Sequence, residues 1–456
     1  MSTSAAKTVL ADLGEAGDVV TDADVLEGYR RDQAAPGLLE AGMPAVLVRP
    51  RTTVQVQAAV RAAALHGVAV VPRGAGSGLS GGANALDGCL LLSLERMTDV
   101  VEVDAASLTA TVQPGLVNAA LGEAARGKGL WYAPDPGSYE FSTIGGNVAT
   151  NAGGLCCVKY GVTRDALLGL EVVLADGRAV RVGRRTRKGV AGYDLAGLMC
   201  GSEGTLGVIT EATMRLLPAP GPASTLAAVF PELGAAGEAI AQIVRGCQPS
   251  LLELMDRATV NAVEDFQPMG LERDAAALLF ARSDAAGGVA DVEWMSARCE
   301  EAGATLVVTS DEEAEGRMLM TARRFAYTAL EHRGTTLLDD VAVPLGAIPA
   351  LLTGIEQIAG EHGVTIATFG HAGDGNMHPT VVYDHRDPVQ AAAARAAFVA
   401  IVALARRLGG TVSGEHGIGL LKRSFLAEEL GDALELNRTI KRALDPHALF
   451  NPGKAI

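Results

Sequence analysis

Short apolar runs separated by glycines occupy the first half of the chain. Between residues 44 and 217 these runs are rich in Val and Leu, and they read AVLVRP, GVAVVPRG, CLLLSL, LTATVQPG, LEVVLADG and GTLGVITEATMRLL. One stretch at residues 53–67, TVQVQAAVRAAALHG, is alanine-rich and has the spacing of a helix instead. The pattern predicts an α+β domain built from short strands and few helices.

A proline-rich stretch at residues 216–224, LLPAPGPAS, interrupts this pattern and indicates a domain boundary. Beyond it, stretches of helical and strand character alternate, which is typical of a second α/β domain. Helices are expected at residues 232–247 and 346–362, and strands at residues 304–310, 337–344 and 364–370. We therefore expect an N-terminal segment, a first domain, a second domain and a C-terminal loop and helix, at residues 1–41, 42–220, 221–412 and 413–456.

Composition and charge exclude several classes of protein. The 456 residues are 48% hydrophobic and 20% charged, which is too apolar for a disordered chain and typical of a globular one. A net charge of −15 argues against a nucleic-acid partner. The only dense basic run, RVGRRTRKG at residues 181–189, is interpreted as a solvated loop.

Cysteine use and hydropathy bear on the compartment. Six cysteines without CxxC spacing predict a reducing compartment and no disulfides, so we expect a cytoplasmic protein. The N-terminus lacks the basic start and apolar stretch of a signal peptide, and no apolar run reaches the length of a membrane span. Any membrane association is then expected to go through partners, and a homodimer is compatible with the sequence.

The first glycine-rich block, PRGAGSGLSGG at residues 72–82, formally matches the dinucleotide fingerprint G-x-G-x-x-G from Gly76 to Gly81. That fingerprint requires a helix to begin at its last glycine, whereas here the chain leads directly into the strand CLLLSL. Backbone amides freed by the missing Cβ atoms can instead hold a diphosphate in a concave nest. The alternative is a flexible loop without a ligand.

A second glycine-rich block, STIGGNVATNAGG at residues 142–154, favours the cofactor interpretation. It places Thr143, Asn147, Thr150 and Asn151 among glycines, where small polar side chains suit a cofactor lying against backbone. Together with KYGVTRDALLGLEVVLADG and GYDLAGLMCGSEGTLGVIT, the two blocks resemble the FAD-binding domain of the vanillyl-alcohol-oxidase and p-cresol-methylhydroxylase type. The resemblance implies bound FAD.

The resemblance also implies which positions contact the flavin. They are Arg73, Gly74, Ala75, Gly76, Ser77, Gly78, Leu79, Pro136, Gly137, Ser142, Thr143, Gly145, Gly146, Asn147, Thr150, Asn151, Gly153, Gly154, Glu203, Gly204, Ile209 and Asn451. Some members attach FAD to a histidine where this chain has Ser77, so non-covalent FAD is implied. Cys156 departs from the family, whose close members carry a basic residue there.

Two short loops concentrate histidines and acids. FGHAGDGNMHPTVVYD at residues 369–384 contains His371 and His378, and SGEHGIG at residues 413–419 contains Glu415 and His416, although the chain has only eight histidines. Two imidazoles and one carboxylate make a metal site with open positions, so His371, His378 and Glu415 are the expected ligands. Adjacent residues do not easily face one ion, which leaves His416 to point elsewhere as a base. The alternative is a set of structural histidines.

The motifs GHAGDGNMHP, SGEHGIGLLKR and LDPHALFNPGK extend the resemblance to the FAD-linked 2-hydroxyacid dehydrogenases. The resemblance implies a divalent metal, Zn or Mn, on the three ligands, and His416 as the group that takes the hydroxyl proton. It also places an arginine on the substrate carboxylate, expected here at Arg323, with Arg324 as the alternative register. Arginine suits this task because its fork grips a carboxylate through two hydrogen bonds.

Two departures from the family pattern narrow the range of expected substrates. Hydroxyglutarate-oxidising members carry a lysine and an asparagine where this chain has Leu338 and Thr380, so a small monocarboxylic acid such as glycolate or D-lactate is expected. Its oxidation to the 2-oxoacid would send hydride to flavin N5. The chain lacks a Cys₄ cluster motif, a haem CxxCH and a convincing NAD fold, so we expect an external acceptor: a quinone, a cytochrome, or iron–sulfur or flavin partner subunits. The alternatives are a D-2-hydroxyglutarate-type dehydrogenase and, from another class, a zinc hydrolase.

Overall fold

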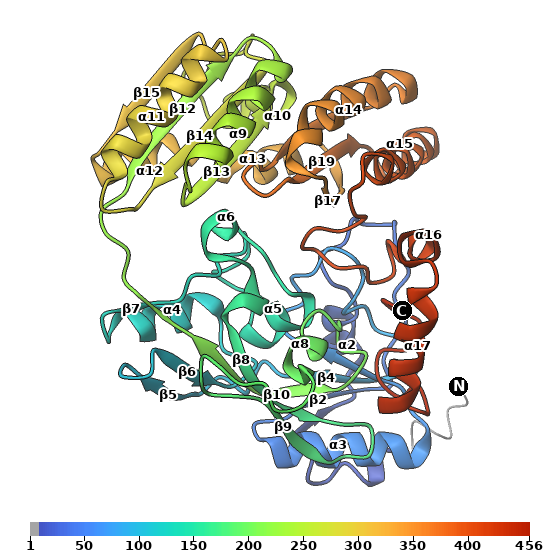
Figure 1. Cartoon of the computed structure of the whole chain (residues 1–456). Helices are drawn as coiled ribbons and strands as arrows, with labels where there is room; N and C mark the ends of the chain where they lie inside the picture. The colour runs from blue at the N-terminus through green and yellow to red at the C-terminus, as the bar shows by residue number, and fades with distance from the viewer. Residues whose placement is uncertain (1–8) are drawn as a thin grey trace.

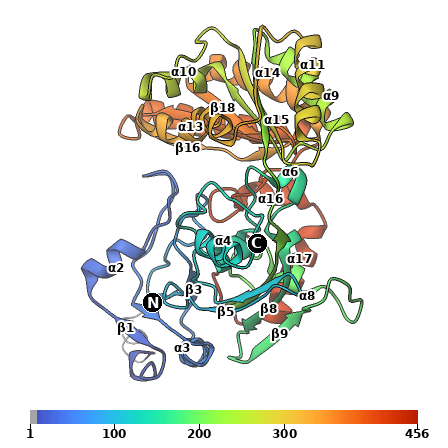
Figure 2. The ribbon, with the colours of Figure 1, turned by 90° about the vertical axis from the view of Figure 1, so that its left-hand side faces the viewer.

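The computed structural model describes residues 9–456, so residues 1–8 of the expected N-terminal segment lie outside the described part. Figure 1 shows two halves, one above the other. The lower half holds the first sheets, the upper half holds one large sheet with its helices, and the C-terminal helices return to the lower half. Figure 2 shows the same division after a quarter turn.

The lower half begins with a four-stranded sheet of order β1-β2-β4-β3. Its strands and adjoining helices are β1 (Asp18–Val20), α2 (Ala23–Tyr29), β2 (Val46–Arg49), α3 (Thr53–His66), β3 (Val70–Arg73) and β4 (Leu90–Ser93). β4 pairs in parallel with β2 and β3, whereas β1 pairs antiparallel with β2 although it lies in the expected N-terminal segment. Thr52 caps α3, and left-handed Gly67 ends it, as the alanine-rich spacing predicted.

The second sheet of the lower half is five-stranded and antiparallel, with the order β5-β6-β10-β8-β9. Its strands are β5 (Val100–Asp104), β6 (Thr109–Val112), β8 (Leu167–Val173), β9 (Ala179–Gly183) and β10 (Val208–Arg215). The accompanying elements are α4 (Asn118–Arg126), β7 (Leu130–Trp131), α5 (Ile144–Thr150), α6 (Cys157–Tyr160), α7 (Thr163–Ala166), α8 (Leu195–Met199) and β11 (Leu217–Pro218). All six apolar runs of the first half therefore form strands, as predicted.

The upper half is a single antiparallel sheet of eight strands, with the order β15-β12-β14-β13-β18-β19-β16 and β17 beside β19. The strands are β12 (Ser224–Phe230), β13 (Leu251–Asp256), β14 (Ala277–Ser283), β15 (Leu306–Ser310), β16 (Thr335–Leu338), β17 (Val341–Ala342), β18 (Thr365–His371) and β19 (Asn376–Tyr383). Alternating helices and strands suggested an α/β domain, but neighbours in sequence such as β12 and β13 both pair with β14 and run antiparallel to it.

Helices cover both faces of this large sheet. They are α9 (Leu233–Gly246), α10 (Arg257–Phe266), α11 (Gly288–Glu301), α12 (Glu313–Leu319), α13 (Thr321–Glu331), α14 (Ile348–His362) and α15 (Pro388–Arg407). One core cluster joins the sheet to α9, α11, α14 and α15, and another joins its opposite face to α10 and α13. The period-two alternation of side chains in the strands supplies these two apolar faces.

Helix α15 is long and apolar enough, by length and composition alone, to cross a membrane. In the structure its buried side chains, including Phe398 and Ile401, belong to the core cluster of the upper half. The helix packs against α14 and β19.

The chain ends in the lower half after crossing back from the upper one. The segment from residue 413 includes the short helices at Arg423–Phe425 and α16 (Leu426–Leu430), followed by α17 (Ala433–Leu444). Beyond α17 the backbone joins β3, because Val70 donates to Leu449 and Asn451 donates to Val70, each at 2.8 Å. The C-terminal segment thus connects both halves, and this connection positions the candidate site.

Candidate active site

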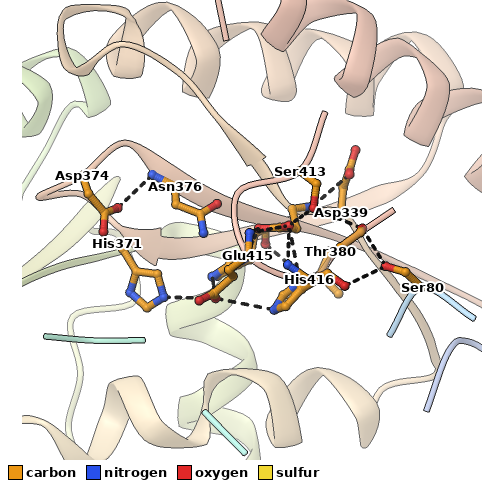
Figure 3. A network of polar contacts seen from close by, with 12 residues as sticks. Ser80, Asp339, His371, Asp374, Asn376, Thr380, Ser413, Glu415 and His416 are labelled. Carbon is orange, nitrogen blue, oxygen red and sulfur yellow. Dashed lines mark hydrogen bonds and ion pairs between the residues drawn. The ribbon is translucent and has the colours of Figure 1, made fainter. Parts of the chain in front are cut away.

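The turn between β18 and β19 brings the two loop histidines together. His371 ends β18, and His378 lies on β19 opposite Phe369 in the strand register. Both side chains are buried, and their rings stand edge to face with centroids 5.1 Å apart. Glu415 enters from the C-terminal loop, so that its Oε1 lies 3.4 Å from His371 Nε2 and 3.3 Å from His378 Nε2 (Figure 3).

His416 does not point away from this cluster, as the sequence analysis expected it to. His416 Nε2 lies 3.5 Å from Glu415 Oε1, and its ring stacks on that of His378 at a centroid distance of 5.0 Å. The loop turns tightly between these residues, so the side chain of His416 folds back towards the carboxylate of its own neighbour. Three imidazole nitrogens therefore surround one carboxylate oxygen (Figure 3).

Asp340, which the sequence analysis did not assign to the site, holds this loop in place. Its buried carboxylate accepts hydrogen bonds from the backbone amides of Glu415 and His416, at 3.0 and 2.9 Å, and from Ser413 Oγ at 2.8 Å. Lys422 anchors the same region by donating to the Asp340 carbonyl at 2.7 Å and pairing with Asp339 at 3.0 Å. Two adjacent aspartates inside the apolar run LLDDVAVP were the signal that could have revealed it.

Glu253 is a second residue that the sequence analysis missed. It lies fully buried on β13, where its Oε1 is 2.6 Å from His371 Nδ1 and its Oε2 accepts a hydrogen bond from Arg323 Nε at 2.7 Å. The guanidinium of Arg323 also lies 4.8 Å from the ring centre of Phe369. One carboxylate therefore connects the expected substrate-binding arginine to an expected metal ligand, and its signal was a lone glutamate within LLELMD.

The structure shows which of the two adjacent arginines on α13 faces the candidate site. Arg323 is buried and faces Glu253, whereas Arg324 is exposed. Within residues 9–456 the only side-chain hydrogen bond of Arg323 leaves from Nε. Its two Nη groups remain free of protein partners, which is the arrangement that a carboxylate ligand requires.

Electrostatics set different protonation preferences within the cluster. Burial opposes protonation of His371, but Glu253 and then Glu415 outweigh it and raise its pKa well above the usual value. Burial lowers the pKa of His378 to about 4, so this imidazole is neutral and offers a lone pair. Burial would raise the pKa of Glu415, but hydrogen bonds from His371 and His378 lower it well below its usual range.

The donor set fits a divalent metal ion. The ligating atoms of His371, His378 and Glu415 all lie within 4.8 Å of one another. Two atoms bound about 2.1 Å from one tetrahedral zinc ion lie about 3.4 Å apart, close to the 3.3 and 3.4 Å measured from Glu415 Oε1. Neutral imidazole and carboxylate ligands suit zinc and also manganese.

The two glycine-rich blocks lie against each other and form the candidate flavin site. A Cβ atom on Gly74 would lie 2.5 Å from Thr143 Oγ1, so the blocks approach to backbone contact. As predicted, no helix forms between β3 and β4; the second block instead begins α5, which Thr143 caps. Several buried polar atoms here have no protein partner and fit a polar cofactor: Arg73 Nη1, Ser142 Oγ, Asn147 Nδ2 and Asn451 Oδ1.

Other expected flavin contacts have side chains engaged within the protein. Thr143 Oγ1 accepts from the Gly146 amide at 3.3 Å, Thr150 Oγ1 donates to the Gly146 carbonyl at 3.2 Å, and Asn151 Oδ1 accepts from the Arg164 amide at 2.9 Å. These side chains position the backbone of α5 and its end, and each keeps a further donor or acceptor that the contact does not use.

The last part of the chain closes this region. The Glu203 carboxylate accepts hydrogen bonds from the amides of Ile418 and Gly419, both at 2.8 Å. Asn451 Nδ2 donates to the carbonyls of Gly82 and Glu203, at 3.0 and 2.8 Å, and Lys454 donates to the same Gly82 carbonyl at 3.0 Å.

The remaining expected contacts occupy four places. Residues 75–79 lie in the irregular loop after β3, Pro136 and Gly137 precede the turn before α5, Gly145 and Gly146 begin α5, and Gly153 and Gly154 follow it. Gly204 packs on Pro72, and Ile209 is buried on β10. The departure at Cys156 is a buried thiol whose Sγ lies 3.6 Å from Arg282 Nη2, so a guanidinium stands beside it.

Residues 219–455 match the family described as FAD linked oxidases, C-terminal domain, and residues 44–183 match the FAD binding domain family. The chain belongs to the FAD-linked oxidases. The match confirms the expected FAD and makes this FAD-linked oxidase an FAD-dependent oxidoreductase.

Relatives and solved structures agree with this assignment. This FAD-linked oxidase is 41% identical to glycolate oxidase subunit GlcD of Bacillus subtilis over 90% of this chain and 89% of the relative. It is 36% identical to D-lactate dehydrogenase of Archaeoglobus fulgidus over 94% of this chain and 96% of the relative.

Its fold resembles 4-ethylphenol oxidase from Gulosibacter chungangensis, with a TM-score of 0.81 at 19% identity over 100% of this chain and 98% of that one. It also resembles p-cresol methylhydroxylase, with a TM-score of 0.80 at 18% identity over 99% and 96% of the two chains. The expected p-cresol-methylhydroxylase-type fold is confirmed.

Proposed function

We propose that the protein oxidises a small 2-hydroxyacid, such as glycolate or D-lactate, to the corresponding 2-oxoacid. The names of its relatives, a glycolate oxidase subunit and a D-lactate dehydrogenase, support this substrate class. The match to an FAD binding domain leaves the zinc-hydrolase alternative without support, since a hydrolase would not use a flavin.

One observation carries the proposal. Glu253 joins the guanidinium of Arg323 to His371, and His371, His378 and His416 all face Glu415. The guanidinium of Arg323 and the histidine cluster are thus held in a fixed position relative to each other. A substrate with a carboxylate next to its hydroxyl requires such an arrangement, because both groups must be bound at once.

Arg323 is the residue proposed to hold the substrate carboxylate. Its Nε is used by Glu253, which fixes the plane of the guanidinium and leaves both Nη groups to donate in parallel. The guanidinium of Arg323 also lies over the ring of Phe369. This arrangement orients the hydroxyl-bearing carbon relative to the histidine cluster.

The surroundings favour a monocarboxylate over a dicarboxylate. Leu338 and Thr380 stand opposite each other in the β16–β19 register, and neither provides a positive charge for a distal carboxylate. Lys422 is not free for that task, because its ammonium donates to the carbonyls of Asp340 and Val412 and pairs with Asp339. Glycolate and D-lactate fit this charge pattern better than D-2-hydroxyglutarate.

When bound, FAD supplies the acceptor for the hydride from C2, and the divalent metal supplies positive charge that makes the substrate hydroxyl more acidic. His371, His378 and Glu415 would hold the metal. His416 takes the hydroxyl proton at Nε2, and the Asp340 carboxylate, 3.9 Å from His416 Nδ1, stabilises the resulting imidazolium. The substrate loses one hydride and one proton, which leaves the 2-oxoacid.

The electrons must then leave the protein. The six cysteines are free and none belongs to a group of three metal-ligating side chains among residues 9–456, so the proposed acceptor is external: a quinone, a cytochrome or a partner subunit. The Bacillus relative is named as a subunit, which supports the last of these. We propose a cytoplasmic location, with any membrane attachment through such partners.

An anaerobic titration tests the proposal. Purified protein is mixed with glycolate, D-lactate, L-lactate and D-2-hydroxyglutarate, and loss of the oxidised flavin absorbance is recorded. Bleaching by glycolate or D-lactate in preference to the dicarboxylate is expected; no bleaching by any 2-hydroxyacid would reject the function. In a chelated sample bleaching should stop while the oxidised flavin spectrum persists, and Zn²⁺ or Mn²⁺ should restore it.

A further inference from the structure

A basic groove lies on the lower half, lined by residues of α7, β8, α8 and β10. Two adjoining cavities of about 280 and 230 Å³ share Leu168, Arg187 and Arg215 as lining residues. The cationic residues that line the two cavities, which we call the basic groove, are Arg164, Arg184, Arg185, Arg187 and Arg215. The active-site proposal uses none of them.

Much of the charge in the basic groove is not neutralised. Arg164 pairs with Asp194 and Arg185 pairs with Glu102, but Arg184, Arg187 and Arg215 have no ion pair within residues 9–456. Arg215 also has a buried Nε without a hydrogen-bond partner. Like charges gathered in one concave site repel one another, and a bound anion would relieve that repulsion.

The loop that supplies part of the basic groove also carries exposed apolar side chains. It joins β9 to α8 and extends from the lower half in Figure 2. Val190 is 99% exposed and Tyr193 95%, and Leu195, the first residue of α8 directly after this loop, is 42% exposed. Arginine and tyrosine are the residue types most enriched at the energetic centres of protein–protein interfaces.

We propose that the basic groove and the β9–α8 loop form the docking surface for an acidic segment of a partner protein. A concave row of guanidiniums suits projecting carboxylates, each of which can be held by two hydrogen bonds. A flat anionic membrane would not reach into the cavities, and Asp194, between Tyr193 and Leu195, opposes insertion of that loop. Two connected cavities also exceed what a single phosphate fills.

The basic groove is directly connected to the candidate flavin site. Arg164, which lines the groove with its side chain, donates its backbone amide to Asn151 at the end of α5. The groove wall at α8 is joined to α5 as well, since the Gly201 amide donates to the Val148 carbonyl at 2.9 Å. A partner docked here would sit on the flavin-binding half and could serve as the external electron acceptor. That role of the partner rests on the function proposed above.

Peptide binding to the purified holoprotein tests the docking surface. The probe is a fluorescent glutamate-rich peptide with one central tyrosine, and the test variant is Arg184→Glu/Arg187→Glu. The matched control is Arg126→Glu/Lys128→Glu, which makes the same charge change at exposed positions at and just beyond the end of α4. The parent and control should bind in a salt-sensitive manner, and the test variant should bind at least about tenfold more weakly. Tyr193→Ser should weaken binding by a smaller factor.

The proposal would be overturned by no binding of the acidic peptide to the parent, by equal loss in the control variant, or by displacement of the peptide by stoichiometric inorganic phosphate. Binding to phosphatidylglycerol vesicles in place of the peptide would assign the surface to a membrane and equally reject it. Flavin bleaching by hydroxyacid in the test variant is the independent readout, because it should equal that of the parent. Failure of bleaching in the parent would reject the proposed function while leaving the docking result intact.

Discussion

Gly153 faces the carboxylate of Glu415 so closely that a Cβ atom on Gly153 would lie 2.3 Å from Glu415 Oε2. Gly153 follows α5 in the flavin-binding half, whereas Glu415 belongs to the loop that reaches the histidines of the upper half. The glycine block and the histidine cluster are therefore two walls of one site. The candidate flavin site thus lies close to the histidine cluster, and hydride transfer from a substrate held between them requires this proximity.

Gly153→Ala should lower turnover by about 10²-fold, because the added methyl displaces a carboxylate whose position the reaction depends on. Gly122→Ala is the control, since a Cβ at this position on α4 meets nothing within 4 Å and Gly122 is not among the expected flavin contacts. Steady-state rates and flavin content of both variants decide the matter. Unchanged turnover in Gly153→Ala would show that Glu415 is not needed at its observed position.

His416→Ala and Glu415→Ala should have different effects although the residues are neighbours. Loss of His416 should leave FAD and metal bound and slow flavin reduction by about 10²–10⁴-fold, as for a missing general base. Loss of Glu415 should lower the metal content, since only His371 and His378 then remain of the expected ligands. Stopped-flow reduction and elemental analysis test both. Because His416 Nε2 also faces Glu415, metal loss in His416→Ala would identify it as a ligand instead of a base.

Arg323→Lys should raise the substrate concentration at half-saturation at least about tenfold, because an ammonium replaces a two-pronged donor. Arg324→Lys is the matched control, since Arg324 is exposed on the other side of α13. Saturation curves for glycolate and D-lactate on both variants give the comparison. An equal effect of the two substitutions would remove Arg323 from the proposed carboxylate site.

Glu253→Gln should weaken metal binding by about 10–100-fold, as is common when the hydrogen-bond partner of a ligating histidine is lost. It should also weaken substrate binding, because Glu253 orients Arg323 as well as His371. Metal affinity and substrate half-saturation are measured separately. In an Arg323→Lys background the effect of Glu253→Gln on half-saturation should shrink, since the two residues act through one contact; full additivity would refute that coupling.

Acid precipitation should release the flavin into the supernatant. Ser77 stands where a histidine would form the covalent link, and a serine hydroxyl does not supply the imidazole nitrogen of that bond. Absorbance of the supernatant and pellet distinguishes the outcomes. Flavin retained in the pellet would point to an attachment residue other than position 77.

Local sequence patterns located the apolar strands of the first half and the helices α3, α9 and α14, but not how strands pair. The six apolar runs of the first half form strands because each has the length and the Val and Leu content of one. The antiparallel order of the upper sheet depends on contacts between segments far apart, such as β13 with β18, which no local pattern encodes. Helix α5 was missed for a related reason: its glycines disfavour a helix, and the Thr143 cap and the burial of Ile144 and Val148 in the core stabilise it.

Candidate site residues were predictable where they belonged to a short motif. They were missed where the only signal was a single side chain. His371, His378, Glu415 and His416 lie in two glycine-framed loops, and the structure brings all four together. Glu253 and Asp340 are isolated acids within apolar strands and loops, where the sequence does not tell which buried partner each one serves. The orientation of His416 also depended on the backbone path of its loop, which residue types alone do not determine.

Asn451 and Lys454, close to the end of the chain, bond to Gly82 in the first glycine-rich block, and Asn451 also bonds to Glu203. During synthesis the flavin-binding half therefore leaves the ribosome long before Asn451 and Lys454, which complete the candidate flavin site. A nascent chain halted after β19 would lack both this closure and Glu415. Flavin loading is accordingly expected only after this late segment has been made, so that a chain cut short by a nonsense mutation would not retain a reactive flavin able to leak electrons to oxygen.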